Sequence, residues 1–158
     1  MELAESAQKV QKELLARGIQ AKVVELPDST RTAVEAAQTI GCTVAQIVKS
    51  LVFRGATSGE PVLIEASGIN RVNEKAVEQI LGEAIVKADA DFVREKTGFA
   101  IGGIPPLGHA TRMGAVLIDE DLLQYAELWA AAGTPHAVFC LTPAELIEIA
   151  AGKVVAIK

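Results

Sequence analysis

Residues 97–109, Thr-Gly-Phe-Ala-Ile-Gly-Gly-Ile-Pro-Pro-Leu-Gly-His, are the most informative segment of this sequence. Their glycines and adjacent prolines exclude a helix interior or a central strand, because glycine costs backbone entropy and proline removes a hydrogen-bond donor. Apolar side chains are interleaved with them, at Phe99, Ile101, Ile104 and Leu107. We therefore expect a stiff loop packed on a core, which either shapes a ligand pocket or is a tight structural connection.

Length and composition indicate one domain over residues 1–158, with half of the residues apolar. The net charge of −5 argues against a broad basic surface for nucleic acid, although it allows a grip on the end of one. Neither a long apolar run nor a signal-peptide pattern is visible, so we expect a cytoplasmic protein without a membrane span. We interpret Cys42 and Cys140 as small buried residues, not a disulfide.

Capping and stop signals predict five helices among short strands. The clearest signal is Thr142-Pro143-Ala144-Glu145, a capping box with proline at the first helical position. A second capping box begins at Thr32, and the acidic residues 119–121 are either a helix start or a solvated face. Helices are expected at residues 4–17, 32–40, 73–81, 89–96 and 142–150, and the strand candidates are 20–25, 47–54, 61–66, 84–87, 114–118, 126–130, 137–141 and 154–157.

This mixture has no strict strand–helix–strand rhythm. It predicts a mixed α/β (α+β) fold, with a central mixed, partly barrel-like sheet of about six or seven strands flanked by helices.

Lys49 is the one charged residue on a strand face that it shares with Ile47, Leu51 and Phe53, because side chains two residues apart point the same way. A buried ammonium without a partner is costly, so such a lysine shifts its pKa or meets an anionic ligand. The alternative is that Lys49 snorkels at a sheet edge or that this face is exposed.

No Walker loop, dinucleotide-binding spacing or Cys-x-x-Cys pair is present, and we expect no metal or cofactor. The remaining candidates are Lys49, the threonines on either side of Arg31, the glycine–proline loop, and two histidines, His109 and His136. A glycine-rich backbone can hold a carbonyl oxygen or a water, and a lysine can hold a phosphate or an oxyanion. This set suits hydrolysis of an activated carbonyl on a phosphorylated ligand.

Three blocks together resemble the YbaK/ProX family of aminoacyl-tRNA deacylases, which includes the editing domain of bacterial prolyl-tRNA synthetases. They are Ser29-Thr30-Arg31-Thr32, Ile47-Val48-Lys49-Ser50-Leu51-Val52-Phe53, and the loop from Thr97 through Gly102-Gly103-Ile104-Pro105-Pro106 to His109. The block beginning at His136 is closer to the free-standing ProX-like branch. The similarity runs from about residue 20 to the end.

The resemblance implies an editing fold that hydrolyses the ester of a mischarged aminoacyl-tRNA, typically Ala- or Cys-charged proline tRNA. Water attacks without a metal or a protein nucleophile, and a ribose hydroxyl of the tRNA can assist. It assigns the functional lysine to Lys49 and places Gly102 and Gly103 at the scissile carbonyl. It also implies substrate-binding residues, which are Thr30, Thr32, Ser50, Ile104, Pro105, Pro106 and His136.

The expected partner is the acceptor end of a mischarged tRNA, with prolyl-tRNA synthetase as a further candidate. Two other classes stay open at this point. One is a binding module that captures aminoacyl-tRNA or a synthetase without hydrolysis. The other is an esterase that acts on small aminoacyl esters.

Overall fold

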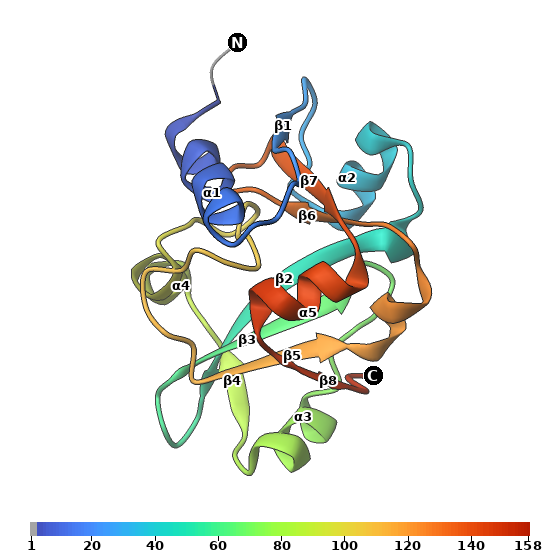
Figure 1. The fold of residues 1–158 in the computed structure, drawn as a ribbon. Coiled ribbons are helices and arrows are strands. Elements are labelled where there is room, and N and C mark those ends of the chain that lie inside the picture. Colours follow the sequence, from blue (N-terminus) through green and yellow to red (C-terminus); the bar gives the residue numbers. More distant parts are fainter. Residues whose placement is uncertain (1–2) are drawn as a thin grey trace.

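The computed structural model describes residues 3–158, which form helices around one mixed sheet (Figure 1). The helices are α1 (Glu5–Ala16), α2 (Ala33–Ile40), α3 (Glu74–Leu81), α4 (Ala90–Thr97) and α5 (Pro143–Ala150), with 3-10 turns η1 (Val44–Gln46) and η2 (Glu120–Gln124). The strands are β1 (Val24–Glu25), β2 (Ile47–Gly55), β3 (Pro61–Ser67), β4 (Ile85–Lys87), β5 (Ala115–Asp119), β6 (Leu128–Ala131), β7 (Ala137–Leu141) and β8 (Lys153–Val155).

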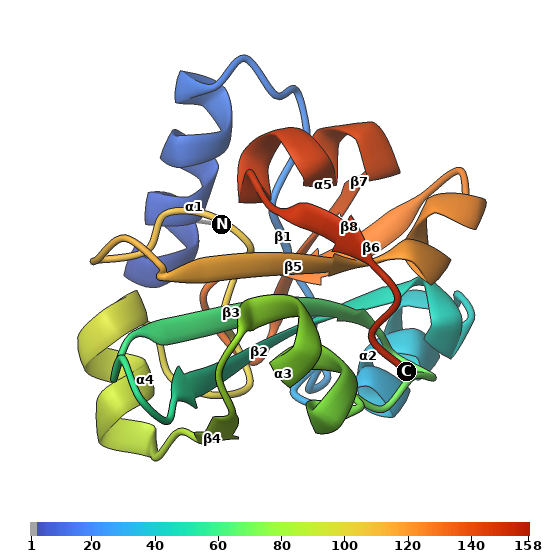
Figure 2. The same cartoon turned by 90° about the horizontal axis from the view of Figure 1, so that it is seen from below.

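The sheet has 8 strands in the order β1-β7-β6-β2-β3-β5-β8, and β4 also pairs with β2. The hairpin β2–β3 is antiparallel, whereas β3 with β5, β5 with β8 and β2 with β6 are parallel. Figure 2 shows α1 and α5 above the sheet and α3 below it. The predicted class, a central mixed sheet flanked by helices, is confirmed.

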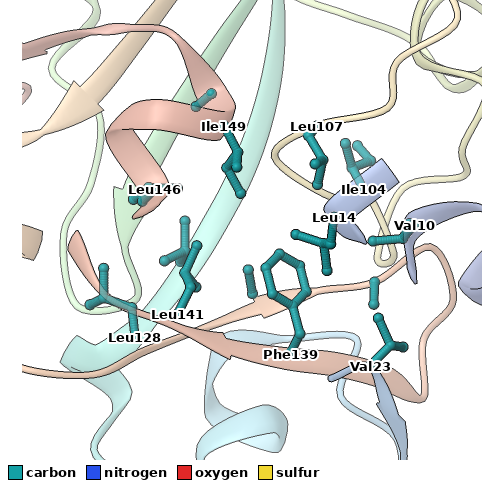
Figure 3. Packing of buried hydrophobic residues seen from close by; sticks show 14 of the residues in the cluster. Val10, Leu14, Val23, Ile104, Leu107, Leu128, Phe139, Leu141, Leu146 and Ile149 are labelled. Carbon is teal, nitrogen blue, oxygen red and sulfur yellow. The ribbon is translucent and has the colours of Figure 1, made fainter. Parts of the chain in front are cut away.

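The largest core lies between the sheet, α1, α5 and the glycine–proline loop (Figure 3). Phe139 of β7 is fully buried in it and faces Leu14 of α1. Ile104 and Leu107 of the loop are buried in the same cluster, so the expectation of a loop packed on a core is confirmed. A second core, between the sheet and α3, contains Ile64 and Val77.

The helix starts follow the predicted capping residues. Thr142 and Glu145 bond each other's backbone amides, at 3.2 and 2.8 Å. At α2 the capping box is incomplete: Thr32 accepts from the Glu35 amide at 3.1 Å, but the Glu35 carboxylate accepts from the Thr32 hydroxyl instead of its amide. No helix among residues 3–158 is long and apolar enough to cross a bilayer.

The expected first strand, residues 20–25, shortens to Val24–Glu25. The cause is the side chain of Gln11 in α1, which donates to the Ala21 carbonyl at 3.1 Å and accepts from the Val23 amide at 2.8 Å. This backbone therefore pairs with a helix side chain instead of a strand. The last strand likewise ends early, because the Ile157 carbonyl accepts from the Asn73 amide at 2.6 Å.

The acidic segment 119–121 begins a 3-10 turn, so the helix start is confirmed and a solvated face is wrong for Asp119. Asp119 is 1% exposed. Its carboxylate accepts from the backbone amides of Ser67 and Asp121, at 2.9 and 3.0 Å. The carboxylate thus ties the end of β5 to the end of β3.

Candidate functional site

A cavity of about 360 Å³ opens beside the middle of β2, on the side of the strand where no other strand pairs with it. Along one edge β2 pairs with β3, and along the other it pairs with β6 only at Ile47–Val48 and with β4 only at Phe53–Gly55. The backbone between these short pairings has no strand beside it on that edge. Side chains from both faces of β2 therefore reach the cavity, including Lys49 and Ser50.

Six of the ten predicted site residues line this cavity. They are Thr30, Thr32, Lys49, Ser50, Gly102 and Ile104. The remaining wall is mainly apolar and comes from α2, β2, β6, β7 and the loop: Ala33, Ala36, Ile40, Ile47, Val48, Leu51, Ile101, Trp129, Ala130, Ala131 and Val138. Segments far apart in the sequence thus meet as the resemblance implied.

Backbone hydrogen bonds join the loops that form the rim. Thr30, which is buried, donates from its amide and its hydroxyl to the Pro135 carbonyl, at 2.6 and 2.9 Å. The Gly133 amide donates to the Gly103 carbonyl at 2.8 Å. The loops around residues 30, 103 and 134 are therefore held in one arrangement before any ligand arrives.

Two glycines of the loop are required by close approach. A Cβ on Gly102, whose φ is +99°, would lie 2.7 Å from Cγ of Arg31. A Cβ on Gly103 would lie 2.9 Å from the backbone of Thr134. Arg31 packs its stem on Gly102 and is exposed at the cavity mouth, where its guanidinium supplies positive charge.

The other predicted site residues lie outside the cavity lining. Gly103 donates to the Ala100 carbonyl at 3.2 Å and accepts from Gly133, so both of its backbone groups are engaged. The Pro105 carbonyl lies 2.7 Å from Nε2 of His109, and Pro106 lines a separate cavity with His109. His136 is exposed, with Nδ1 3.2 Å from the Asp28 carbonyl. The catalytic and substrate-binding roles of all ten residues stay predictions from the resemblance, including those of Pro105, Pro106 and His136.

Burial also affects the imidazole of His109. Desolvation lowers its pKa, and the contact with the Pro105 carbonyl opposes that shift only in part. The ring therefore stays neutral at physiological pH and is able to donate to Pro105. This contact fits a residue that supports the loop.

Lys49 is half-buried, and its ammonium donates to the Asn70 carbonyl at 2.7 Å. Burial lowers the pKa of Lys49, the negative charge of Asp119 opposes that shift, and Arg71 adds to it. The side-chain amide of Asn70 donates to Asp119 and to Asp121, each at 2.8 Å. A lysine ammonium has three donors. With one on Asn70, and no other partner among residues 3–158, two are available to a ligand.

Sequence reasoning missed Arg31, Asn70, Asp119 and Glu65 as members or neighbours of the site. Glu65 had a visible signal, since it is the one charged residue in the apolar segment 61–66. It lies opposite Ser50 across the β2–β3 pair. No sequence signal pointed to Asn70, because its hydrogen bond with Lys49 depends on how the turn after β3 folds back. Residues 3–158 bring together no group of three or more His, Cys, Asp or Glu side chains suited to a metal ion, and Cys42 and Cys140 are free and half-buried.

The chain is similar to several known proteins in sequence and in fold. The chain is 49% identical to a solved structure described as "a putative trans-editing enzyme for prolyl tRNA synthetase", with a TM-score of 0.93 and 99% of each chain covered. The solved structure of hypothetical protein APE2540 is 28% identical, with a TM-score of 0.86, and the match covers 94% of this chain and 98% of that one. Uncharacterized protein YwhH of Bacillus subtilis (strain 168) is 35% identical over 132 residues, which is 84% of this chain and 83% of that protein.

The family indicated by the three sequence blocks is confirmed by a match that spans most of the chain. Residues 27–149 fit the model of the aminoacyl-tRNA editing domain, and this range contains every residue that lines the cavity. The chain belongs to the aminoacyl-tRNA editing domain family.

Proposed function

We propose that residues 1–158 act as one editing domain in trans, and that it hydrolyses the ester of mischarged aminoacyl-tRNA, with Ala- or Cys-charged proline tRNA as the preferred substrate. The observation that carries the proposal is the meeting of a half-buried ammonium, Lys49, and the glycine loop at Gly102 in one cavity with apolar walls. The neighbour described as "a putative trans-editing enzyme for prolyl tRNA synthetase" supports the choice of tRNA.

In the proposed reaction, water attacks the ester carbonyl and the bond to the ribose oxygen breaks. The proton from the water passes to that oxygen, with a ribose hydroxyl of the tRNA as relay. The ammonium of Lys49 donates to the negative charge that develops on the carbonyl oxygen or to the terminal phosphate. Such donors stabilise a transition state most when the protein fixes them in advance, as the Asn70 contact does for Lys49.

The two loop glycines have different proposed roles. Gly102 lines the cavity, and its lack of a side chain lets the stem of Arg31 pack against the loop, which places the guanidinium beside the substrate. Gly103 acts as a positioning residue, because its amide and carbonyl are already bonded to Ala100 and Gly133. The loop thus presents one glycine to the substrate and uses the other to hold its shape.

The polar rim suits the acceptor end of tRNA. Arg31 is exposed beside Gly102 and supplies a guanidinium, a group that binds phosphate through paired donors. Thr30 and Thr32 flank it in the same rim. With a net charge of −5, the chain has no general attraction for polyanions, so contact with tRNA is confined to this rim.

A panel of charged tRNAs tests the proposal. Wild-type protein is mixed with proline tRNA carrying Ala, Cys, Ser, Thr or Pro, and loss of the aminoacyl group is followed by acid precipitation. We expect hydrolysis of the Ala or Cys ester and little of the Pro ester. Binding without turnover on all five would favour a binding module, and equal cleavage of aminoacyl-adenosine without tRNA would favour a small-ester hydrolase. Either result would overturn the proposal.

A further inference from the structure

A buried carboxyl lies directly behind the cavity wall. Glu65 of β3 is 0% exposed, and one of its oxygens, Oε1, has no hydrogen-bond partner among the described residues. The other, Oε2, accepts from the hydroxyl of Ser50 at 2.7 Å. Ser50 lines the cavity, so Glu65 reaches the site only through this hydroxyl.

The protonation state of Glu65 sets the direction of that hydrogen bond. Burial raises the pKa of Glu65 to about 8, and the Ser50 hydroxyl opposes the shift only in part. At neutral pH the carboxyl is therefore protonated. Its proton has no acceptor near Oε1, and a buried donor without an acceptor costs about 1–3 kcal/mol. The proton thus sits on Oε2 and is donated to Ser50 Oγ, which frees the Ser50 hydrogen to point elsewhere.

We propose that Glu65 is a positioning residue that turns the Ser50 hydroxyl into a hydrogen-bond donor toward the substrate in the cavity. This inference rests on the proposed function. The acceptor is the ester carbonyl oxygen, whose negative charge grows as water attacks. When Glu65 ionises, its carboxylate accepts the Ser50 hydrogen again, and Ser50 then presents only oxygen lone pairs to the cavity.

No charged group faces Glu65 from the two strands that pair with β3, so the buried carboxyl has no cation as a partner there. The residues opposite it on the paired strands are Ser50 and Ile118, both uncharged. The charged neighbours of those two in sequence, Lys49 and Asp119, point to the opposite sheet face because side chains alternate along a strand. The causes of the pKa shift are correspondingly burial and the Ser50 contact, with no charged group among them.

Two substitutions separate this role from a purely structural one. Glu65→Gln keeps the shape and offers an amide donor to Ser50 at every pH, so it imitates the protonated acid permanently. Ser50→Ala removes the relay and leaves Glu65 in place. Circular dichroism checks that both variants are folded, and kcat and KM for Ala-charged proline tRNA are measured from pH 6.5 to 9.5 after subtraction of uncatalysed hydrolysis. Titration of the substrate amine affects all three proteins alike.

We expect wild-type kcat, relative to Glu65→Gln at the same pH, to be lower by about tenfold at pH 9, about one pH unit above the pKa of Glu65. Loss of one oxyanion donor costs about 10²–10³ in kcat, so the unprotonated protein contributes little to the rate. At pH 7 the Gln variant should stay within about threefold of wild type, because both present the same donor. Ser50→Ala should be slow at every pH, with no such fall. Identical pH profiles in wild type and Glu65→Gln would overturn the proposal.

If wild-type protein hydrolyses no charged tRNA, the proposed function fails, and this inference is decided by binding. The probe is alanine joined by an amide to 3′-amino-3′-deoxyadenosine, which cannot be hydrolysed. Calorimetric titration at pH 7 and pH 9 should show wild-type affinity weakening by about tenfold relative to Glu65→Gln. An equal change in both proteins would overturn the role of Glu65.

Discussion

At the scale of single residues, the site depends on positions where a side chain is excluded. A Cβ on Gly102 meets the flexible side chain of Arg31, whereas a Cβ on Gly103 meets the backbone of Thr134. A side chain can move aside, but a backbone held by the Gly133–Gly103 bond cannot do so cheaply. The two glycines are therefore required for different reasons: Gly103 because of the Thr134 backbone, and Gly102 because its φ of +99° strains any side chain even if Arg31 moves aside.

We expect Gly103→Ala to lower the free energy of unfolding by about 1–3 kcal/mol, the usual cost of overpacking. The deacylation rate should fall with it, because the displaced loop carries Gly102. Urea unfolding followed by circular dichroism measures the stability change. Ala100→Ser, at an exposed position of the same loop, is the control and should change little. Wild-type stability in Gly103→Ala would show that the close approach to Thr134 does not constrain the loop.

At the scale of helices and strands, local chemistry decides where the elements begin. The capping box at the start of α5 satisfies two backbone amides through Thr142 and Glu145. This helix supplies Leu146 and Ile149 to the largest core (Figure 3), so the stability of its first turn affects the packing of that core.

Thr142→Ala should reduce the free energy of unfolding by about 0.5–2 kcal/mol, as expected for loss of an N-cap hydroxyl. Thermal and urea unfolding provide the measurement. Thr57→Ala, in the exposed turn between β2 and β3, is the matched control with no such cap. Equal stability of the two variants would contradict the contribution assigned to the cap.

Most elements could be predicted from the sequence because caps and stops act within a few residues. Thr142 and Asn73 are examples, each followed closely by the helix that it caps. The short first strand could not be predicted, because the backbone near Val23 bonds to Gln11, a residue of another element. The same reason hid the Asn70 contact of Lys49. The Lys49 strand and the glycine loop could be predicted because the alternation along residues 47–53 and the glycines and prolines of residues 97–109 are local patterns.

At the scale of the whole molecule, a buried carboxyl couples stability to pH. Burial raises the pKa of Glu65 from 4.5 to about 8 in the folded chain. Between these values the folded state binds a proton that the unfolded state has lost. The stabilising effect of this proton is complete below about pH 4.5 and is lost as the pH rises through about 8.

The contribution of Glu65 to stability should therefore decline between pH 5 and pH 8 and level off above pH 8. A shift of this size corresponds to a total change on the order of 4–5 kcal/mol, at 1.36 kcal/mol per pKa unit. Urea unfolding of wild type and Glu65→Gln at pH 5, 6.5, 8 and 9 measures this contribution as the difference between their free energies of unfolding. The free energy of unfolding of wild type minus that of Glu65→Gln should become smaller, or change sign, as the pH rises. A difference that stays constant with pH would show that Glu65 does not titrate in this range.

The site itself is a product of the whole fold. Residues near 30, 49, 102 and 130 line one cavity because α2, β2, the glycine loop and β6 meet at the open edge of β2. The sequence predicted which residues belong to the site, but their meeting point depends on strand order, which no local pattern contains. The chemistry proposed for the cavity depends most on the ammonium of Lys49.

The most direct test is the rate of deacylation of Ala- or Cys-charged proline tRNA by Lys49→Ala. The variant should remain folded by circular dichroism and lose at least about 100-fold in kcat/KM, as removal of a fixed donor to developing charge predicts. Lys75→Ala, at an exposed position on α3, is the control and should keep the wild-type rate. A folded Lys49→Ala protein with a rate within about twofold of wild type would contradict the assignment of this cavity as the editing site.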